Sequence, residues 1–224
     1  MNNFLRNDIV EINSQEDELQ FQIIDAYGED IDKGMLNDRF QNLSYQINLF
    51  GITKEGKSVY CKVVNFKPYF FVKCPQNWSE YDVYQFKEYL CDRMGYNSEW
   101  KFQLQDIKMV KAKEFRGFTA NKHNNYMKII FNSYQCYKEC RKLLYKKYQS
   151  NGRFIKLFQY ESNIDPLLRF FHIKEIKPCS WIKLNKNEYI SLNKSKSRTQ
   201  ISVKTKWDNC NYLHVNNMQC QEKI

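Results

Sequence analysis

Apolar and polar side chains alternate along two stretches near the start of the chain, and this alternation predicts two strands. The stretches are residues 20–25 and 45–50, and a period of two is typical of strands with one buried face. Residues 27–40 between them contain Gly28 and Gly34 but no periodic apolar pattern, so a surface loop is predicted there. A turn then leads into a further strand over residues 58–65.

A second group of elements begins after Pro68. Ser79 is a suitable N-cap for the first helix of this group. The predicted elements are, in order, a strand over 69–73, a helix over 78–94, strands over 107–113 and 125–131, and a helix over 133–148. The order β-α-β-β-α is shared by ferredoxin-like and RNA-recognition-like subdomains, in which two helices cover one face of a small antiparallel sheet.

The last third of the chain returns to short apolar stretches. A short helix over 167–171 begins with Pro166 in its first turn. Strands are predicted over 154–157, 173–176, 180–184, 189–192 and 200–207. The fold class is therefore α+β, with a β-rich, barrel-like N-terminal part and an inserted β-α-β-β-α subdomain of RNA-recognition or ferredoxin-like type.

Four segments follow from this interpretation. Residues 1–66 form an acidic leader and the first strands of the N-terminal domain, and 67–150 form the β-α-β-β-α subdomain. Residues 151–207 are the returning β-rich part of the N-terminal domain, and 208–224 are a truncated or disordered tail.

Composition narrows the class of protein. With 42% hydrophobic and 16% aromatic residues but only 4 Pro and 7 Gly, the chain is expected to be globular rather than disordered. No apolar run approaches the ~20 residues of a membrane span, and no secretory signal begins the chain. We therefore expect an intracellular protein with no membrane partner. The 8 cysteines lack the paired spacing of a zinc site, so reduced thiols are expected.

Charge is divided unevenly along the chain. The net charge is +10, but residues 1–38 hold ten acids against two basic residues. The remaining 186 residues carry 33 basic and 15 acidic side chains, a surplus that attracts nucleic-acid phosphates if it lies on one face. An A/T-rich genome would also favour Lys over Arg, so basicity alone leaves a structural or protein-interaction module open.

A basic and aromatic segment is the strongest candidate for nucleic-acid binding. Residues 108–128 combine cations with aromatic rings around Gly117, a mixture that suits phosphate pairing and base stacking on single strands. A solvated hairpin with inward-facing aromatics is the alternative. The candidate DNA-binding residues are Lys111, Lys113, Arg116, Phe118, Lys122 and Lys128.

Two other patterns suggest catalysis only weakly. Residues 51–58 formally match a phosphate-binding loop, but that loop needs a helix after it, and residues 59–64 read as a strand. A nucleotide-hydrolysing enzyme is therefore a distant alternative. The acidic groups at 16–18 and 30–32 lie in loop-like sequence, where a solvated role is expected rather than a two-metal site.

Several blocks, taken in order, resemble the N-terminal region of family B DNA polymerases, above all the delta-like enzymes of large DNA viruses. They are residues 45–72, ending Lys-Pro-Tyr-Phe-Phe-Val; residues 115–119, Phe-Arg-Gly-Phe-Thr; residues 160–173, containing Asp-Pro-Leu-Leu-Arg-Phe-Phe-His; and Trp181 with Ile182. The resemblance covers about residues 20–207. Cys179 and Ser180 depart from the small residue and Gly usual in the family.

The resemblance implies a non-catalytic portion of a DNA-directed DNA polymerase that acts in DNA replication. Its implied partners are single-stranded template DNA and the exonuclease and polymerase domains of the same enzyme. Arg169, His172 and Trp181 are the candidate residues of the interdomain junction. No cofactor is expected in this chain, and Mg²⁺ is expected only in catalytic domains that it lacks, because it contains neither exonuclease nor polymerase metal motifs. The implied location is the nucleus or a cytoplasmic viral factory.

Overall fold

The computed structural model describes most of the chain. The described residues are 9–10, 12–36, 40–95, 104–113, 123–146, 148–150, 153–192 and 198–213. They form two compact units, each assembled from separate parts of the sequence. Unit 1 comprises Met1–Glu29, Gln46–Phe66 and Leu167–Ile224, and unit 2 comprises Asp30–Tyr45 and Lys67–Pro166.

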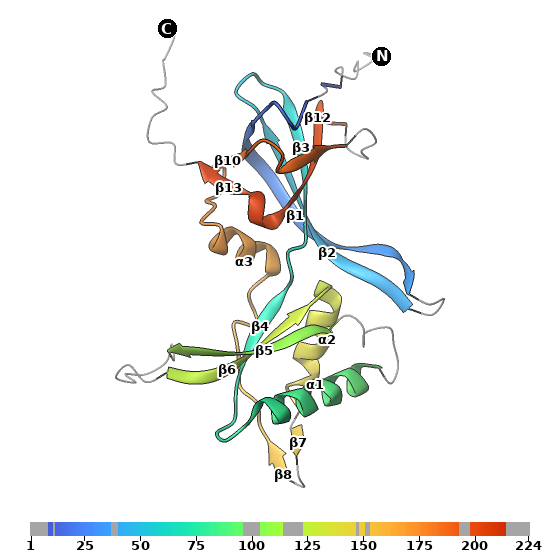
Figure 1. Ribbon diagram of the computed structural model, residues 1–224, viewed down its shortest axis with the longest axis vertical. Helices are drawn as coiled ribbons and strands as arrows, with labels where there is room; N and C mark the ends of the chain where they lie inside the picture. Colours follow the sequence, from blue (N-terminus) through green and yellow to red (C-terminus); the bar gives the residue numbers. More distant parts are fainter. Residues whose placement is uncertain are drawn as a thin grey trace, which may run out of the picture. The chain divides into compact units, whose positions relative to one another are not determined.

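Unit 1 is built on a seven-stranded sheet in the order β11-β12-β3-β2-β1-β10-β13 (Figure 1). Strand β12 runs parallel to β3, whereas β2 and β10 run antiparallel to their partners β3 and β1. The strands are β1 (Leu19–Leu36), β2 (Phe40–Ile52), β3 (Ser58–Val64), β10 (Trp181–Leu184), β11 (Tyr189–Ser191), β12 (Ile201–Lys206) and β13 (Asn211–Leu213).

The core of unit 1 follows from strand alternation. Every second residue of β3 is buried, while the residues between are half-buried, as expected for a strand with one face toward the core. Helix α3 (Pro166–Ile173) adds Phe170 to the core of the unit. Its ring meets Phe66 edge-to-face at 5.8 Å, and Phe66 meets Trp207 in the same way at 5.7 Å.

Unit 2 contains a four-stranded antiparallel sheet in the order β5-β6-β4-β9 and two helices on one of its faces (Figure 1). Large buried side chains of the sheet and of both helices form one hydrophobic cluster. The elements are β4 (Tyr69–Lys73), α1 (Glu80–Gly95), β5 (Leu104–Lys113), β6 (His123–Phe131), α2 (Tyr134–Leu143) and β9 (Gln159–Tyr160), with a small hairpin of β7 (Tyr148–Ser150) and β8 (Arg153–Ile155).

The mixed α+β class is confirmed, but the predicted loop over residues 27–40 is wrong. Strand β1 continues to Leu36 and β2 begins at Phe40, so most of this segment belongs to two long neighbouring strands. Acids occupy several of the exposed positions within β1. The stretch therefore shows no alternation of apolar and polar residues that would have predicted a strand. The predicted helix over 133–148 ends at Leu143, and the predicted strand over 173–176 is replaced by the end of α3 and a turn.

The formal phosphate-loop match is a β-hairpin. Strand β2 pairs antiparallel with β3, and the backbone amide of Thr53 donates to the carbonyl oxygen of Lys57 at 2.9 Å. Gly56 has a φ of +78°, a conformation that glycine adopts without strain. Because Ser58 begins a strand instead of a helix, the expectation that this match is accidental is confirmed. The stretch predicted as a C-terminal tail from residue 208 includes strand β13.

Candidate nucleic-acid interface

The sheet of unit 2 has one face covered by helices and one face that the helices leave open. Phe70 and Val72 of β4 are fully buried in the cluster with α1 and α2. Successive side chains of a strand point to opposite faces, so Tyr69, Phe71 and Lys73 lie on the other side, where all three are half-buried. We call that side the open sheet face.

The neighbouring strands continue the same division. On β6, Met127 and Ile129 are buried in the helix-covered cluster, which places Tyr126 and Lys128 on the open sheet face. The described part of this face includes Tyr69, Phe71 and Lys73 of β4, Asn124, Tyr126, Lys128 and Ile130 of β6, Asp106, Lys108, Val110 and Ala112 of β5, and Tyr160 of β9, as the strand registers require.

Aromatic contacts organise the centre of this face. The ring of Tyr126 meets Tyr160 edge-to-face at 5.4 Å between centroids, and Tyr69 meets Phe71 in the same way at 5.5 Å. The Nζ atom of Lys128 lies 3.7 Å from the centroid of the Tyr69 ring, a cation–π contact. Four aromatic rings and a cation are therefore held in fixed mutual positions by three paired strands.

A hollow of about 140 Å³ lies at one end of the open sheet face. Tyr126 is only 4% exposed, and Phe71 and Tyr160 are half-buried. Its lining comprises Phe71, Ala112, Lys113, Tyr126, Tyr160 and Glu161. Half of the lining residues are thus aromatic, and the others are one alanine, one cation and one acid.

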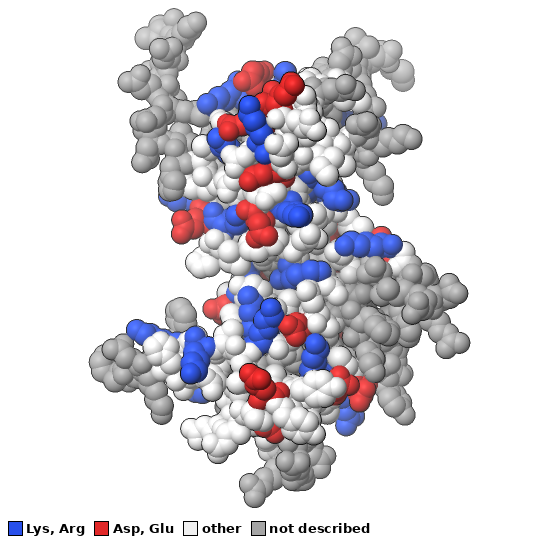
Figure 2. Space-filling model, in the orientation of Figure 1, with Lys and Arg blue, Asp and Glu red and all other residues white. Residues whose placement is uncertain are grey.

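Positive charge gathers near this end of the sheet. Figure 2 shows blue side chains at the ends of β5 and β6. Lys111 pairs with Asn125 and Lys113 with His123 across these strands, and both lysines are exposed. Of the two, Lys113 lines the hollow.

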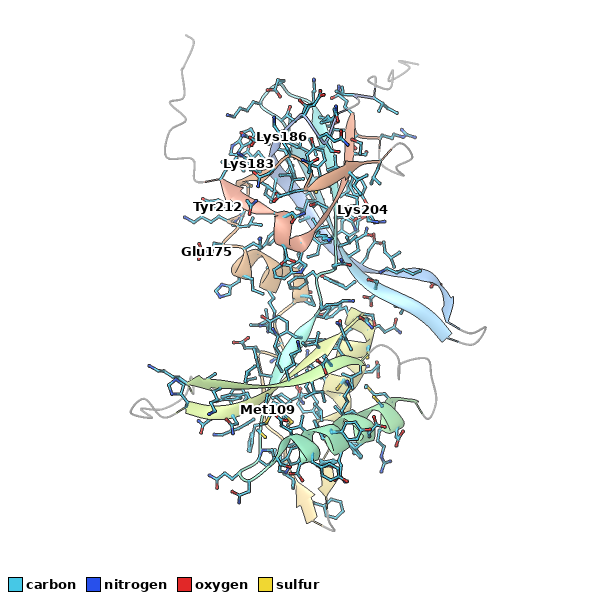
Figure 3. The ribbon with its side chains drawn as sticks, viewed as in Figure 1. Met109, Glu175, Lys183, Lys186, Lys204 and Tyr212 are labelled. Atoms are coloured by element: carbon cyan, nitrogen blue, oxygen red, sulfur yellow. The ribbon has the colours of Figure 1, made fainter. Side chains whose placement is uncertain are left out.

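Lys111 lies on the other side of β5. Met109, two residues earlier, has its sulfur 4.0 Å from the sulfur of the buried Cys74, and Figure 3 shows Met109 on the helix side of the β5 ribbon. By strand alternation Lys111 and Lys113 share that side, although Lys113, the last residue of β5, also borders the hollow. The lysine of β5 that lies centrally on the open sheet face is Lys108, which pairs with Lys128.

The other predicted DNA-binding residues have different outcomes. Lys128 lies on the open sheet face, half-buried against Tyr69. Arg116, Phe118 and Lys122 lie outside the described residues. Prediction from the sequence missed Phe71 and Tyr160, although alternation from the buried Phe70 would have placed Phe71 on the opposite face.

The candidate junction residues all lie in unit 1. Arg169 is 5% exposed on α3, so its side chain is buried. His172 is exposed near the end of the same helix. Trp181 begins β10, half-buried, and the Nζ atom of Lys54 lies 5.9 Å from its ring centroid. The three side chains therefore differ in accessibility, and His172 is the most accessible to a partner.

Side chains that could coordinate a metal are scattered over both units. Within the described ranges, no group of three or more His, Cys, Asp and Glu side chains is arranged to hold a metal ion. No helix in the described part of the chain is long and apolar enough to cross a membrane.

Similarity to curated proteins is extensive. The sequence is 31% identical over 198 residues to a DNA polymerase of Pyramimonas orientalis virus, covering 88% of this chain and 16% of that polymerase. It is 34% identical over 169 residues to the DNA polymerase delta catalytic subunit of Dictyostelium discoideum, covering 71% of this chain and 15% of the subunit. The chain thus spans about a sixth of the length of these relatives. No protein-family model matches the sequence.

The fold has a counterpart among solved structures. The family B DNA polymerase from the hyperthermophilic archaeon Pyrobaculum calidifontis superimposes with a TM-score of 0.55, at 15% sequence identity. The match covers 87% of this chain and 20% of the archaeal one. At this level of identity the likeness concerns the fold.

Proposed function

We propose that this chain, which belongs to the family B DNA polymerases of the viral and delta type, is the N-terminal, non-catalytic portion of such an enzyme. In this role it binds template-side DNA during replication and packs against exonuclease and polymerase domains. Those domains hold the Mg²⁺ ions, and the protein works inside the cell where DNA is replicated. The chain spans about a sixth of the length of its relatives. The rest of such a polymerase is therefore long enough to contain both catalytic domains.

The open sheet face of unit 2 is the observation that carries DNA binding. Its strand order β5-β6-β4-β9, with two helices on the opposite face, supports an RNA-recognition-like subdomain. In such subdomains aromatic side chains of the sheet stack on unpaired bases. Phe71 and Tyr126 occupy the two central strands of this sheet, which is where stacking positions are required.

The lysines of the same face supply the second half of the interaction. Lys108 and Lys128 are paired across β5 and β6, and Lys73 lies on the next strand. A groove that combines cations with aromatic rings binds single strands with little sequence preference, since phosphates and base faces recur at every nucleotide. Template-side single-stranded DNA fits this chemistry.

The test is the salt-dependent binding of a fluorescent single-stranded oligonucleotide, measured by anisotropy. Substituting both Lys108→Ala and Lys128→Ala should weaken binding about tenfold at low salt. It should also reduce the slope of log affinity against log salt, by about 0.7 for each phosphate that the protein no longer neutralises. The matched control carries Lys138→Ala and Lys146→Ala, which remove the same charge from exposed positions on and after α2.

Three outcomes are informative. Selective loss of affinity in the open-face variant supports the proposal. Equal loss in both variants would show that charge acts without regard to position and would overturn the assigned surface. A chain that binds no single-stranded DNA even at low salt would instead be a structural or protein-interaction module.

A further inference from the structure

We propose that the hollow lined by Phe71, Tyr126 and Tyr160 holds one unpaired base of a bound DNA strand. This inference rests on the proposed function and adds a specific subsite to it. The lysines of the open sheet face bind the phosphate of any nucleotide, whereas the hollow binds the base of one nucleotide.

The walls of the hollow come from paired strands, so their spacing is fixed by backbone hydrogen bonds. Phe71 of β4 lies directly opposite Tyr160 of β9 in the sheet register. Tyr126 of β6 contacts Tyr160 edge-to-face at 5.4 Å and is 4% exposed. Three aromatic rings on three adjacent strands, one of them nearly buried, form a rigid apolar surface, and planar bases stack on such surfaces.

The size of the hollow selects a small occupant. Its volume of about 140 Å³ is well below the ~300 to 1,000 Å³ of pockets that enclose drug-sized ligands. A single ring system fits where a whole nucleotide does not, so sugar and phosphate remain outside. The methyl group of the exposed Ala112 limits the space at the β5 edge, and a larger side chain there would occupy it.

Charge around the hollow identifies the occupant as part of a nucleic acid. Lys113 at the end of β5 belongs to the lining, and Lys73 of β4 pairs with Tyr126 in the sheet register, so cations lie on both strands that flank β6. Glu161 is the one acid in the lining. Aromatic walls flanked by cations complement a base joined to a phosphodiester chain better than they complement an apolar peptide.

The experiment compares two single-stranded oligonucleotides of equal length and charge, one with normal bases and one built entirely of abasic nucleotides. We expect the unmodified chain to bind the normal oligonucleotide about tenfold more tightly. Ala112→Phe, which fills the hollow, should lower affinity for the normal oligonucleotide to that for the abasic one without changing the salt slope. Gln105→Phe, at an exposed position of the same strand outside the hollow, should bind like the unmodified chain.

A second variant tests the base subsite independently, in case Ala112→Phe does not fold. Tyr160→Leu removes one aromatic wall but keeps an apolar side chain, and it should also reduce the preference for normal bases. Binding of both oligonucleotides with equal affinity by the unmodified chain would overturn the base subsite while leaving DNA binding by the open sheet face intact. Failure to bind either oligonucleotide would overturn both proposals.

Discussion

The Oδ1 atom of Asp30 accepts a hydrogen bond from the backbone amide of Tyr134, at an O···N distance of 2.7 Å. The Oδ2 atom of the same carboxylate accepts from the amide of Gln135 at 2.8 Å, and the Oγ atom of Ser133 accepts from the amide of Cys136 at 3.2 Å. The first amides of a helix lack intrahelical partners. Two side chains therefore satisfy three amides at the start of α2, and one brings a negative charge to the positive end of the helix dipole.

Asp30→Ala is expected to destabilise unit 2. The substitution removes both acceptors and leaves the amides of Tyr134 and Gln135 without their side-chain partner, a loss that costs about 1 to 2 kcal/mol for a helix cap. Urea unfolding of the purified chain, followed by circular dichroism, should give a lower midpoint at unchanged slope.

The matched control is Asp32→Ala. Asp32 is also an acid of β1, but it is exposed and accepts a hydrogen bond from the nearby Gly34 amide at 2.8 Å. Its loss should change the midpoint much less. Equal effects of the two substitutions would contradict the assignment of Asp30 as a helix cap.

The same carboxylate should make stability depend on pH. Burial raises the pKa of Asp30 above its ordinary value of 3.8, and this effect outweighs the opposing hydrogen bonds from Tyr134 and Gln135 and the charge of Lys138. A raised folded-state pKa means that the folded chain binds the proton more tightly than the unfolded chain does. The contribution of this group to stability is therefore fully present below the unfolded pKa and is lost as pH rises through the folded pKa.

Comparison with Asp30→Asn isolates that contribution, because Asn does not titrate. The free energy of unfolding of the unmodified chain minus that of the variant should increase as pH is lowered from about 7 to about 4. A difference that stays constant or falls over this range would contradict the predicted direction of the pKa shift.

The sequence predicts those strands that are marked by a short apolar stretch. The stretch 69–73 is strand β4 with the same bounds, and its partner in the core, residues 125–131, lies within β6. The strand signal is weak over Asp30 and its neighbours because Asp30 accepts hydrogen bonds from amides far along the sequence. The helix that Asp30 caps begins 104 residues later. A local sequence pattern cannot predict a contact between residues that are so far apart in the chain.

The candidate interface was predictable to a similar extent. The mixture of cations and aromatics over 108–128 falls on strands β5 and β6, and Lys128 lies on the open sheet face. The lysines at 108, 111 and 113 only nearly alternate, and strand alternation assigns Lys111 to the helix side. Tyr160 could not be recognised because β9 has only two residues, too few to show a period.

Gly51 is expected to tolerate no side chain. A Cβ atom at this position would overlap the backbone carbonyl oxygen of Gln22 and the ring of Phe21, both on strand β1. Relief of such overlap requires backbone shifts that cost about 3 kcal/mol. Gly51→Ala should therefore strongly lower the thermal unfolding temperature of the chain.

Gly56→Ala provides the comparison within the same hairpin. Nothing lies within 4 Å of a Cβ atom there, but the φ of +78° places an L-residue in the left-handed region, at about 1 kcal/mol. The loss of stability should thus be smaller than for Gly51→Ala. The reverse ranking would show that the close approach of β2 to β1 is not what requires glycine at position 51.

The described cysteines should differ sharply in thiol reactivity, because they differ sharply in exposure. Six of them are buried and Cys179 alone among the described residues is exposed. Burial raises the pKa of Cys210 to about 12 and raises that of Cys61 and Cys140 well above the ordinary value, so the reactive thiolate is scarce at neutral pH.

In a Cys220→Ser background, a chromogenic disulfide reagent should therefore titrate one thiol rapidly. Cys179→Ser should abolish that fast phase, and urea should release the six buried thiols. Rapid reaction of several thiols in the folded chain would contradict the packing of both cores.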